Sequence, residues 1–367
     1  MAILLCAGML LPALRLSAAE KEKTMIEAGK DYSFMNCDTG RVIRAGDTEY
    51  FRLEAADGGY YLTDSAGCYF RIDSGSLRQS EIKQKLIITG HQRGRFSKAE
   101  LKEADAFCRE NGIELIPCIQ TLAHLNAMFK WVNRYGAIND TADILLADDD
   151  RTYELIDKIF ATLSECSRRI HIGMDEAYMV GLGKYRDKHG DNDRFETINR
   201  HLHKVCDMAD KYGFKPMIWS DMFCKLAVSS SDYYSTADLE AIRKKANLPE
   251  NLTLVYWDYY STDYNRYSNM IEKNKAFGRP VAFAGGAWTW KGFAPDNQFS
   301  FDPTLPAVKA CRDRGVKDIF FTMWGDNGGE CSRFAVLPAL CYSAELLEGN
   351  ENMSDAKARL KALTGME

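Results

Sequence analysis

The sequence lacks any concentrated run of basic residues. Its 47 lysines and arginines are outnumbered by 52 aspartates and glutamates, which gives a net charge of −5. Proteins that bind nucleic acid or anionic membrane surfaces use clustered positive charge, so we expect neither partner. Apolar runs are also short, and none reaches the ~20 residues that span a bilayer. The 46% of apolar residues instead predicts a protein with a large core.

The motif C-x-x-C is absent, although the chain contains 11 cysteines. Their number is odd, their spacing is scattered, and several lie in apolar segments, such as Cys118 in IELIPCIQ. This pattern is typical of free thiols, so we expect a cytoplasmic protein with no disulfide framework and no bound metal. The N-terminus partly resembles a secretory signal, with an apolar stretch before Ser17, Ala18 and Ala19, but no Lys or Arg precedes that stretch. Secretion is therefore the weaker alternative.

No G-x-G-x-x-G or Walker motif follows an apolar run, which argues against dinucleotide-binding and P-loop folds. From about residue 97, amphipathic stretches alternate instead with short apolar runs. The amphipathic stretches predict helices at 97–112, 150–169, 194–213, 303–315 and 334–349. The apolar runs predict strands at 113–120, 170–174, 215–221, 251–260, 279–286 and 317–326. Six apolar strands separated by helices predict a parallel sheet and favour an α/β fold of the (β/α)8 TIM-barrel type.

Residues 1–96 break this rhythm. The segments EYFRLEAA, GGYYLTD and CYFRID predict short β-strands joined by turns. KLIITG, residues 85–90, is the one segment of this region that we assign to an early barrel strand, and the first strand stays unassigned. We therefore expect an atypical N-terminal α+β segment over 1–84, which could be the remnant of a small α/β domain. A catalytic barrel would follow over 85–367, and its first strands could be incomplete.

Aromatic and polar side chains gather where the predicted strands end, which is where TIM-barrel active sites lie. These residues are Gln120, Thr121, His124, Asp175, Glu176, Trp219, Asp221, Trp257, Asp258, Tyr259, Trp288, Trp290, Trp324, Asp326 and Asn327. Aromatic rings cover the C–H faces of a pyranose, while carboxylates and amides hold its hydroxyls, so the combination predicts a carbohydrate substrate. The structural alternative is that the tryptophans only close the top of the barrel.

Asp175 and Glu176 are adjacent, in the segment IHIGMDEA. Glycosidases usually place two carboxyl groups on either side of the scissile bond, ~5–5.5 Å apart for retention and ~6.5–9.5 Å apart for inversion. Two consecutive residues can hardly take up such positions. In a 2-acetamido sugar, however, the acetamido oxygen can attack C1 itself. The enzyme then needs one general acid and one neighbouring carboxylate that orients the acetamido group, and no metal or organic cofactor is implied.

At this point the chain resembles a known family. HIGMDEA matches the H-x-G-x-D-E signature of glycoside hydrolase family 20, the β-N-acetylhexosaminidases. The segments CIQTLAHL, WSDMF, YWDYY, FAGGAWTW and WGDNGGE are similar to the branch of that family that includes hexosaminidase D and cytoplasmic bacterial exo-hexosaminidases. The resemblance covers about residues 92–365, and its motifs arrive in the family's order.

The resemblance implies a role for each residue of the site. Asp175 would position the acetamido group, and Glu176 would be the acid/base. Tyr259, or as an alternative Tyr256, would hydrogen-bond the acetamido oxygen. Trp219, Trp288 and Trp324 would wall the sugar pocket, and Asp326 and Asn327 would hold hydroxyls far from C1. His124 would sit at the pocket edge or orient a carboxylate. We also expect Trp257 to contact the substrate, and Asp221 as well unless it only caps the segment that follows it. The implied activity is exo-hydrolysis of terminal β-linked N-acetylhexosamine, with retention, from an oligosaccharide or glycoconjugate.

Two departures from the family leave alternatives open. No early strand with a sugar-gripping Arg and no acidic loop is found before residue 92, and the sequence ends near residue 367, where relatives continue into a helical region. A catalytically impaired sugar-binding relic is therefore one alternative. A glycosidase that acts on plain sugars through an internal carboxylate nucleophile is another. The sequence also leaves open whether the chain forms a homodimer.

Overall fold

The computed structural model describes residues 96, 98–130, 132–227, 246–325 and 329–365, and within residues 1–95 the backbone of the strands named below. Contacts divide the chain into two units. The larger unit combines Met1–Leu10 with Lys98–Glu367, and the smaller unit is Leu11–Ser97. This division differs from the expected one in two places, because residues 1–10 join the larger unit and residues 85–97 the smaller.

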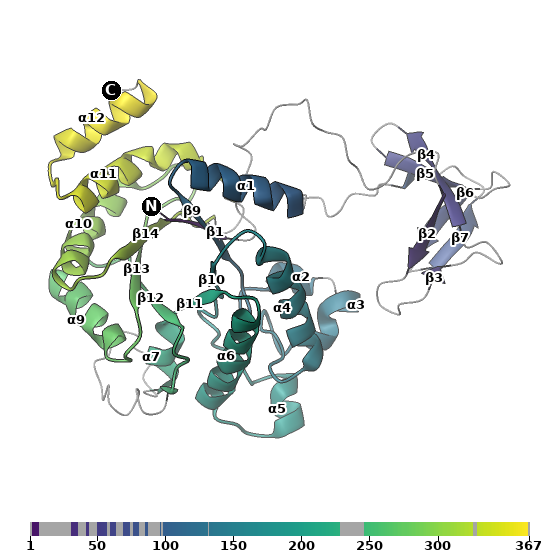
Figure 1. Cartoon of the computed structure of the whole chain (residues 1–367). Coiled ribbons are helices and arrows are strands. Elements are labelled where there is room, and N and C mark those ends of the chain that lie inside the picture. Colours follow the sequence, from purple (N-terminus) through teal and green to yellow (C-terminus); the bar gives the residue numbers. More distant parts are fainter. Residues whose placement is uncertain are drawn as a thin grey trace. The chain divides into compact units, whose positions relative to one another are not determined.

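The larger unit is built on a curved parallel sheet, which Figure 1 shows ringed by helices. Its strands follow the order β1-β9-β10-β11-β12-β13-β14, and every adjacent pair is parallel. Their bounds are Ala2–Cys6 (β1), Glu114–Cys118 (β9), Arg169–His171 (β10), Lys215–Trp219 (β11), Thr253–Trp257 (β12), Val281–Gly286 (β13) and Asp318–Thr322 (β14). The six strands expected after residue 110 are confirmed. The described residues thus give an α/β, TIM-type sheet of seven strands.

The helices include the five expected from the sequence. Those five are Lys98–Glu110 (α1), Asp150–Leu163 (α4), Arg194–Lys211 (α6), Asn297–Asp313 (α10) and Leu337–Glu348 (α11). The others are Asn126–Phe129 (α2), Val132–Tyr135 (α3), Lys184–His189 (α5), Asp221–Ala227 (α7), Tyr264–Lys275 (α9) and Met353–Thr364 (α12), with short 3₁₀ turns at Gly136–Ile138 and Arg333–Val336. Among the described helices, none has the length and apolar character needed to cross a bilayer.

Aspartates start several of these helices by accepting hydrogen bonds from exposed backbone N–H groups. Asp149, Asp193, Asp263 and Asp296 each do so at the residue before α4, α6, α9 and α10. An Asp at this position satisfies an otherwise unpaired N–H and complements the helix dipole, which typically contributes ~1 kcal/mol. These short-range signals help to set where these four helices begin, and so where the loops before them end.

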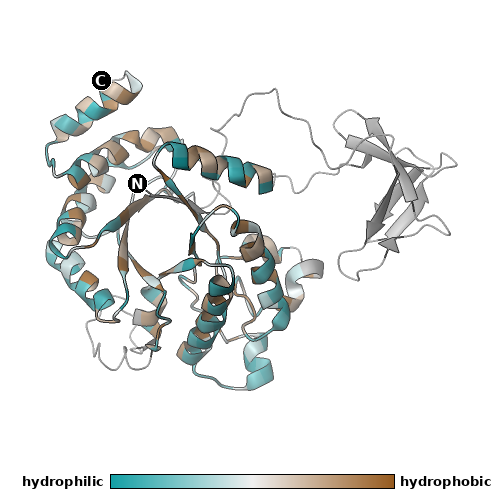
Figure 2. Ribbon diagram, in the orientation of Figure 1, coloured by the Kyte–Doolittle hydropathy of each residue, from teal (hydrophilic) through white to brown (hydrophobic). Residues whose placement is uncertain are grey.

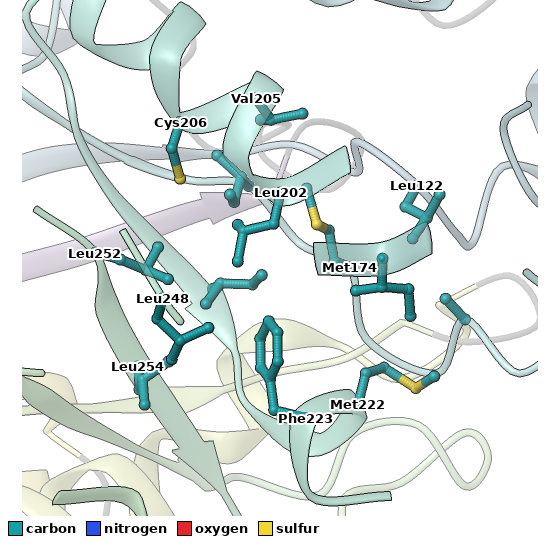
Figure 3. Packing of buried hydrophobic residues seen from close by; sticks show 14 of the residues in the cluster. Leu122, Met174, Leu202, Val205, Cys206, Met222, Phe223, Leu248, Leu252 and Leu254 are labelled. Atoms are coloured by element: carbon teal, nitrogen blue, oxygen red, sulfur yellow. The ribbon is translucent and has the colours of Figure 1, made fainter. Parts of the chain in front are cut away.

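The main core lies between the sheet and its helices. Figure 2 shows apolar colouring along the strands and more hydrophilic colouring on the outer helices, as a sheet covered by helices requires. Figure 3 shows Leu202, Val205 and Cys206 of α6 in one cluster with residues such as Met174 and Leu254. Met174 belongs to the turn that bears the adjacent carboxylates, so core packing anchors that turn.

Arg169 connects three strands at the end of the sheet where they begin. Its guanidinium lies 2.6 Å from Glu114 Oε2, at the start of β9, and 2.9 Å from Asp318 Oδ2, at the start of β14. Because β9 and β14 lie far apart in the strand order, this contact shows that the sheet curls until its distant strands approach each other. The reactive groups lie at the opposite, C-terminal ends.

The smaller unit is an antiparallel sheet with the strand order β3-β2-β4-β5-β6-β7. Its strands are Asp31–Met35 (β2), Val42–Ile43 (β3), Tyr50–Ala56 (β4), Gly59–Thr63 (β5), Tyr69–Asp73 (β6), Ser76–Ser80 (β7) and Lys85–Leu86 (β8). The strands expected in EYFRLEAA, GGYYLTD and CYFRID are confirmed as β4, β5 and β6.

The assignment of KLIITG to the barrel is wrong. Lys85–Leu86 pairs antiparallel with β5 in the smaller unit. The strand that precedes β9 in the sheet is Ala2–Cys6, in the segment that partly resembled a secretory signal. The sequence of a short apolar run does not indicate which strand it pairs with, because the choice between two sheets depends on long-range pairing rather than on local pattern.

Candidate active site

The adjacent carboxylates lie in a tight turn that follows β10. Gly173, Met174 and Glu176 have φ angles of 71°, 70° and 51°, in the left-handed region that non-glycine residues seldom adopt. Each non-glycine residue there costs of order 1 kcal/mol or more, and strain of this kind concentrates at functional sites. Met174 is buried, and its packing in the core anchors the turn. The turn therefore presents Asp175 and Glu176 from a fixed backbone rather than from a loose loop.

Asp175 is held through both of its carboxylate oxygens. Gln120 donates from Nε2 to Asp175 Oδ1 at 2.9 Å, and Gln120 Oε1 accepts from the backbone N–H of Met174 at 3.2 Å. His124 Nε2 lies 3.2 Å from Asp175 Oδ2. The hydrogen bond to Asp175 raises the pKa of His124 to about 9, so the imidazole is a cationic donor at neutral pH. Gln120 and His124 thus leave Asp175 little freedom to rotate.

Glu176 lies near the same imidazole and has further partners of its own. Its Oε2 lies 3.6 Å from His124 Nε2, and its Oε1 accepts from the Tyr178 hydroxyl at 3.4 Å. Its backbone N–H donates to Asp221 Oδ2 at 3.0 Å. The Glu176 side chain is 41% exposed, whereas that of Asp175 is 13% exposed. The more exposed carboxyl group, that of Glu176, can therefore exchange protons with a reactant. The less exposed one, that of Asp175, is better suited to a fixed orienting role.

Asp221 lies beneath this turn at the start of α7. It is buried, and its Oδ1 faces Trp257 Nε1 at 3.5 Å. Burial, together with the nearby charge of Asp175, raises the pKa of Asp221 to about 7. The expectation that Asp221 contacts the sugar stays a prediction. The contacts that are observed connect the turn bearing Asp175 and Glu176 to Trp257 at the end of β12.

Aromatic residues from four strand ends meet beside the carboxylates. Trp324 Nε1 donates to the Tyr259 hydroxyl at 3.1 Å, and the ring of Trp257 stacks on that of Tyr259 with centroids 5.6 Å apart. The ring centroids of Trp219 and Trp324 are 5.8 Å apart, and the ring of Trp288 lies edge-on to that of Tyr259 with centroids 6.0 Å apart. Burial raises the pKa of Tyr259, so its phenol keeps its proton and remains a hydrogen-bond donor.

Tyr259, and not Tyr256, belongs to this aromatic group. The Tyr256 hydroxyl donates to Asp258 Oδ2 at 3.1 Å, and Arg266 also contacts that carboxylate at 3.2 Å. Tyr256 packs against Tyr267 and Phe283 in the layer between sheet and helices. Tyr256 and Trp257 are neighbours in β12 and point to opposite faces of the sheet, whereas Tyr259 follows the strand and stacks on Trp257.

The structure thus brings together most of the predicted site residues. Asp326 and Asn327 fall outside the described residues. Thr121 has a structural role, because its buried hydroxyl donates to the carbonyl oxygen of Ile172 at 2.7 Å. Trp290 stacks on Trp288 with centroids 4.3 Å apart.

Three contacts were not expected from the sequence. Tyr178 reaches Glu176, Lys225 Nζ donates to the Tyr178 hydroxyl at 2.7 Å, and Asp143 Oδ2 accepts from the backbone N–H of His124 at 2.9 Å. Tyr178 follows Glu176 by two residues, so a turn predicted at Glu176 would have indicated that the two side chains lie close together. Lys225 and Asp143 carried no such local signal.

Across the residues that the structure describes, no three or more His, Cys, Asp or Glu side chains are arranged to hold a metal ion. The side chains described at this site can transfer protons through carboxyl groups, orient a reactant by hydrogen bonds and bind an apolar face through indole rings.

A TIM-type sheet with paired carboxylates and an aromatic cluster at its C-terminal end is the arrangement of a glycoside hydrolase. The family model for the catalytic domain of glycosyl hydrolase family 20 matches residues 60–273. This match covers more than half of the chain, which belongs to that family.

Two relatives show how far the likeness extends. Human Hexosaminidase D is 22% identical over 205 residues, which cover 53% of this chain and 40% of the human protein. The structure of the family 20 exo-β-N-acetylglucosaminidase from Vibrio harveyi, in complex with N-acetylglucosamine, has a TM-score of 0.52 at 16% identity. That likeness covers 77% of this chain and 45% of the Vibrio protein. The chain therefore spans less than half the length of either protein, and the structural likeness shows a shared fold.

Proposed function

We propose that this protein is an exo-β-N-acetylhexosaminidase that removes terminal β-linked N-acetylglucosamine or N-acetylgalactosamine from oligosaccharides or glycoconjugates. The observation that carries the proposal is the pair Asp175–Glu176 on one strained turn, with Asp175 clamped and Glu176 more exposed. Membership of glycosyl hydrolase family 20 supports it, as do the activities named for Hexosaminidase D and the Vibrio enzyme.

The first step breaks the glycosidic bond with help from the substrate. The acetamido oxygen attacks C1, the C1–O bond breaks, and its electron pair goes to the leaving oxygen. Glu176 gives that oxygen its proton. Asp175, held by Gln120 and His124, accepts from the acetamido N–H and stabilises the positive charge that develops on the oxazolinium ring. A clamped carboxylate does this better than a free one, because it needs no reorganisation as charge develops.

The second step returns the enzyme to its starting state. Glu176, now a carboxylate, takes a proton from water as the water oxygen attacks C1 and the bond to the acetamido oxygen breaks. Two inversions at C1 give net retention. The Tyr259 phenol, which keeps its proton, would hold the acetamido oxygen toward C1. Trp219, Trp288 and Trp324 would line the pocket around the sugar ring, with Trp257 beside them.

Point variants of the two carboxylates test the proposal. With an aryl N-acetyl-β-glucosaminide as substrate, Glu176→Gln should lower kcat by about 10³-fold or more, because the leaving oxygen loses its proton donor. Asp175→Asn should lower kcat by at least about 10²-fold. The matched control is Asp157→Asn, on α4, where the carboxylate pairs with Lys211 outside the site. Normal turnover by either site variant would show that the roles are wrongly assigned.

Calorimetry separates the enzyme from a sugar-binding relic. If wild-type protein binds N-acetylglucosamine but hydrolyses no aryl N-acetyl-β-hexosaminide, the relic is correct.

A cytoplasmic location is also part of the proposal, supported by cysteines that are free thiols throughout the part of the chain whose side chains are described.

A further inference from the structure

We propose that Tyr178, held in place by Lys225, is a positioning residue for the acid/base Glu176. This inference rests on the proposed function, since it assigns a partner to the group that would transfer the proton. Three side chains carry it: Lys225 Nζ donates to the Tyr178 hydroxyl at 2.7 Å, and that hydroxyl donates to Glu176 Oε1 at 3.4 Å. The Lys225 ammonium also lies 4.3 Å from the centroid of the Tyr178 ring.

The two oxygens of Glu176 meet different chemistry. Oε2 faces His124, whose pKa is raised to about 9 by its hydrogen bond to Asp175. The Nε2–H of His124 is directed to Asp175 Oδ2 at 3.2 Å, and its positive charge, 3.6 Å from Glu176 Oε2, disfavours a proton on that oxygen. Oε1 faces a hydroxyl, which can either donate or accept. The acidic proton of Glu176 therefore belongs on Oε1, next to Tyr178.

A tyrosine hydroxyl can serve both protonation states that the reaction requires. When Glu176 is a carboxylate, the hydroxyl donates to Oε1. When Glu176 is protonated, the hydroxyl oxygen can accept from it while still accepting from Lys225, because it has two lone pairs. Burial and the charge of Glu176 raise the pKa of Tyr178, so the phenol keeps its proton throughout. A lysine or arginine at this position would stabilise only the carboxylate.

Among the residues that the structure describes, the other acidic groups near Glu176 do not replace this contact. Asp175 is its sequence neighbour and is bound by Gln120 and His124. Asp221 accepts from the backbone N–H of Glu176 and does not reach its carboxyl group in any observed hydrogen bond. Tyr178 is itself 41% exposed, so core packing does not explain why its hydroxyl is directed at the acid.

Rate measurements over a pH range test the inference. In Tyr178→Phe and in Lys225→Met, kcat for an aryl N-acetyl-β-glucosaminide should fall about tenfold, with KM within about twofold of wild type. The basic limb of the pH–rate profile should move up by about half a pH unit or more, because each variant removes a group that favours the carboxylate. The double variant should be no worse than the poorer single variant, since both residues act through one contact.

The chain provides a matched control. Lys211 lies 4.8 Å from the ring centroid of Tyr212, and the Tyr212 hydroxyl donates to Asp157 at 3.0 Å, so a second lysine, tyrosine and carboxylate meet between α4 and the C-terminal end of α6. Tyr212→Phe and Lys211→Met should leave the basic limb in place. A basic limb that stays in place in Tyr178→Phe, or that moves equally in Tyr212→Phe, overturns the inference.

A readout without turnover keeps the inference separate from the proposed function. ¹³C NMR of labelled glutamate carboxyl carbons, with Glu176→Gln to assign the signal, follows protonation directly. The midpoint of that signal should move to higher pH in Tyr178→Phe whether or not wild-type protein hydrolyses the substrate. A protein without activity but with this shift refutes the hexosaminidase and keeps the contact. Activity without this shift does the reverse.

Discussion

Replacing Asp221 with asparagine should change how the stability of the larger unit depends on pH. An aspartate has a pKa near 3.9 in an unfolded chain, whereas burial raises the pKa of Asp221 to about 7 in the folded protein. Between these values the unfolded state has released the proton and the folded state retains it. Stability therefore falls as pH rises from about 4 to 7, and above about 7 the loss is complete.

The size of the effect follows from the two pKa values. About three pH units at 1.36 kcal/mol each give a penalty of ~4 kcal/mol for the ionised Asp221. An asparagine keeps an oxygen that can accept from the Glu176 N–H, but places an amide near Trp257 Nε1, which costs about 1 kcal/mol. At pH 8, Asp221→Asn should thus be more stable than wild type by ~2–3 kcal/mol, while at pH 4 it should be equal or slightly less stable.

Thermal unfolding at pH 4 to 8, followed by tryptophan fluorescence, measures this difference. All six tryptophans lie in the larger unit, so the signal reports on that unit alone. The gain at pH 8 should be about 5 °C in Tm. Asp157→Asn is the control, because the hydrogen bond to Lys211 lowers the pKa of Asp157 and should give the opposite trend with pH. The same pH slope in Asp221→Asn and wild type would refute a raised Asp221 pKa.

Three further predictions concern the surroundings of the acid pair. Gly173→Ala should lower activity by about tenfold or more and destabilise the protein by over ~1 kcal/mol, measured by kinetics and Tm, because its Cβ would clash with Gln120 Oε1 and its φ is 71°; unchanged kinetics would contradict this. Tyr259→Phe should lower kcat by about 10-fold to 10²-fold while Tm changes little, since only the hydroxyl that Trp324 contacts is lost, and an equal loss in Tyr256→Phe would argue against the assignment. His171→Gln should reduce the fall of Tm below pH 6.5, because burial lowers the pKa of His171 to about 3 and the unfolded chain gains the proton first as pH falls; an unaltered acid slope would show that His171 does not titrate in this way.

Most of the larger unit could be predicted because its signals are local. The helix at 194–213 appears as α6 within two residues of its expected end, since an Asp cap and an amphipathic pattern specify it without reference to other segments. The strand ends followed from the alternation of strands and helices. The substrate-assisted reaction that the adjacent carboxylates indicated from residue chemistry stays a prediction.

The parts that could not be predicted depend on contacts between distant segments. Ala2–Cys6 and Lys85–Leu86 both lie in short apolar runs of the sequence. Only long-range pairing decides that the first joins β9 and the second joins β5. Lys225 could not be linked to Glu176 because 49 residues separate them, and the turn that brings Tyr178 between them rests on left-handed backbone at Glu176.

The measurement that tests the central claim most directly compares two substrates that differ only in the acetamido group. Wild-type protein should hydrolyse an aryl N-acetyl-β-glucosaminide with at least about 10³-fold higher kcat/KM than the matching aryl β-glucoside, because the second substrate carries no internal nucleophile. Comparable hydrolysis of both substrates would mean that a carboxylate of the protein attacks C1, and would contradict the orienting role of Asp175 and the acid/base role of Glu176.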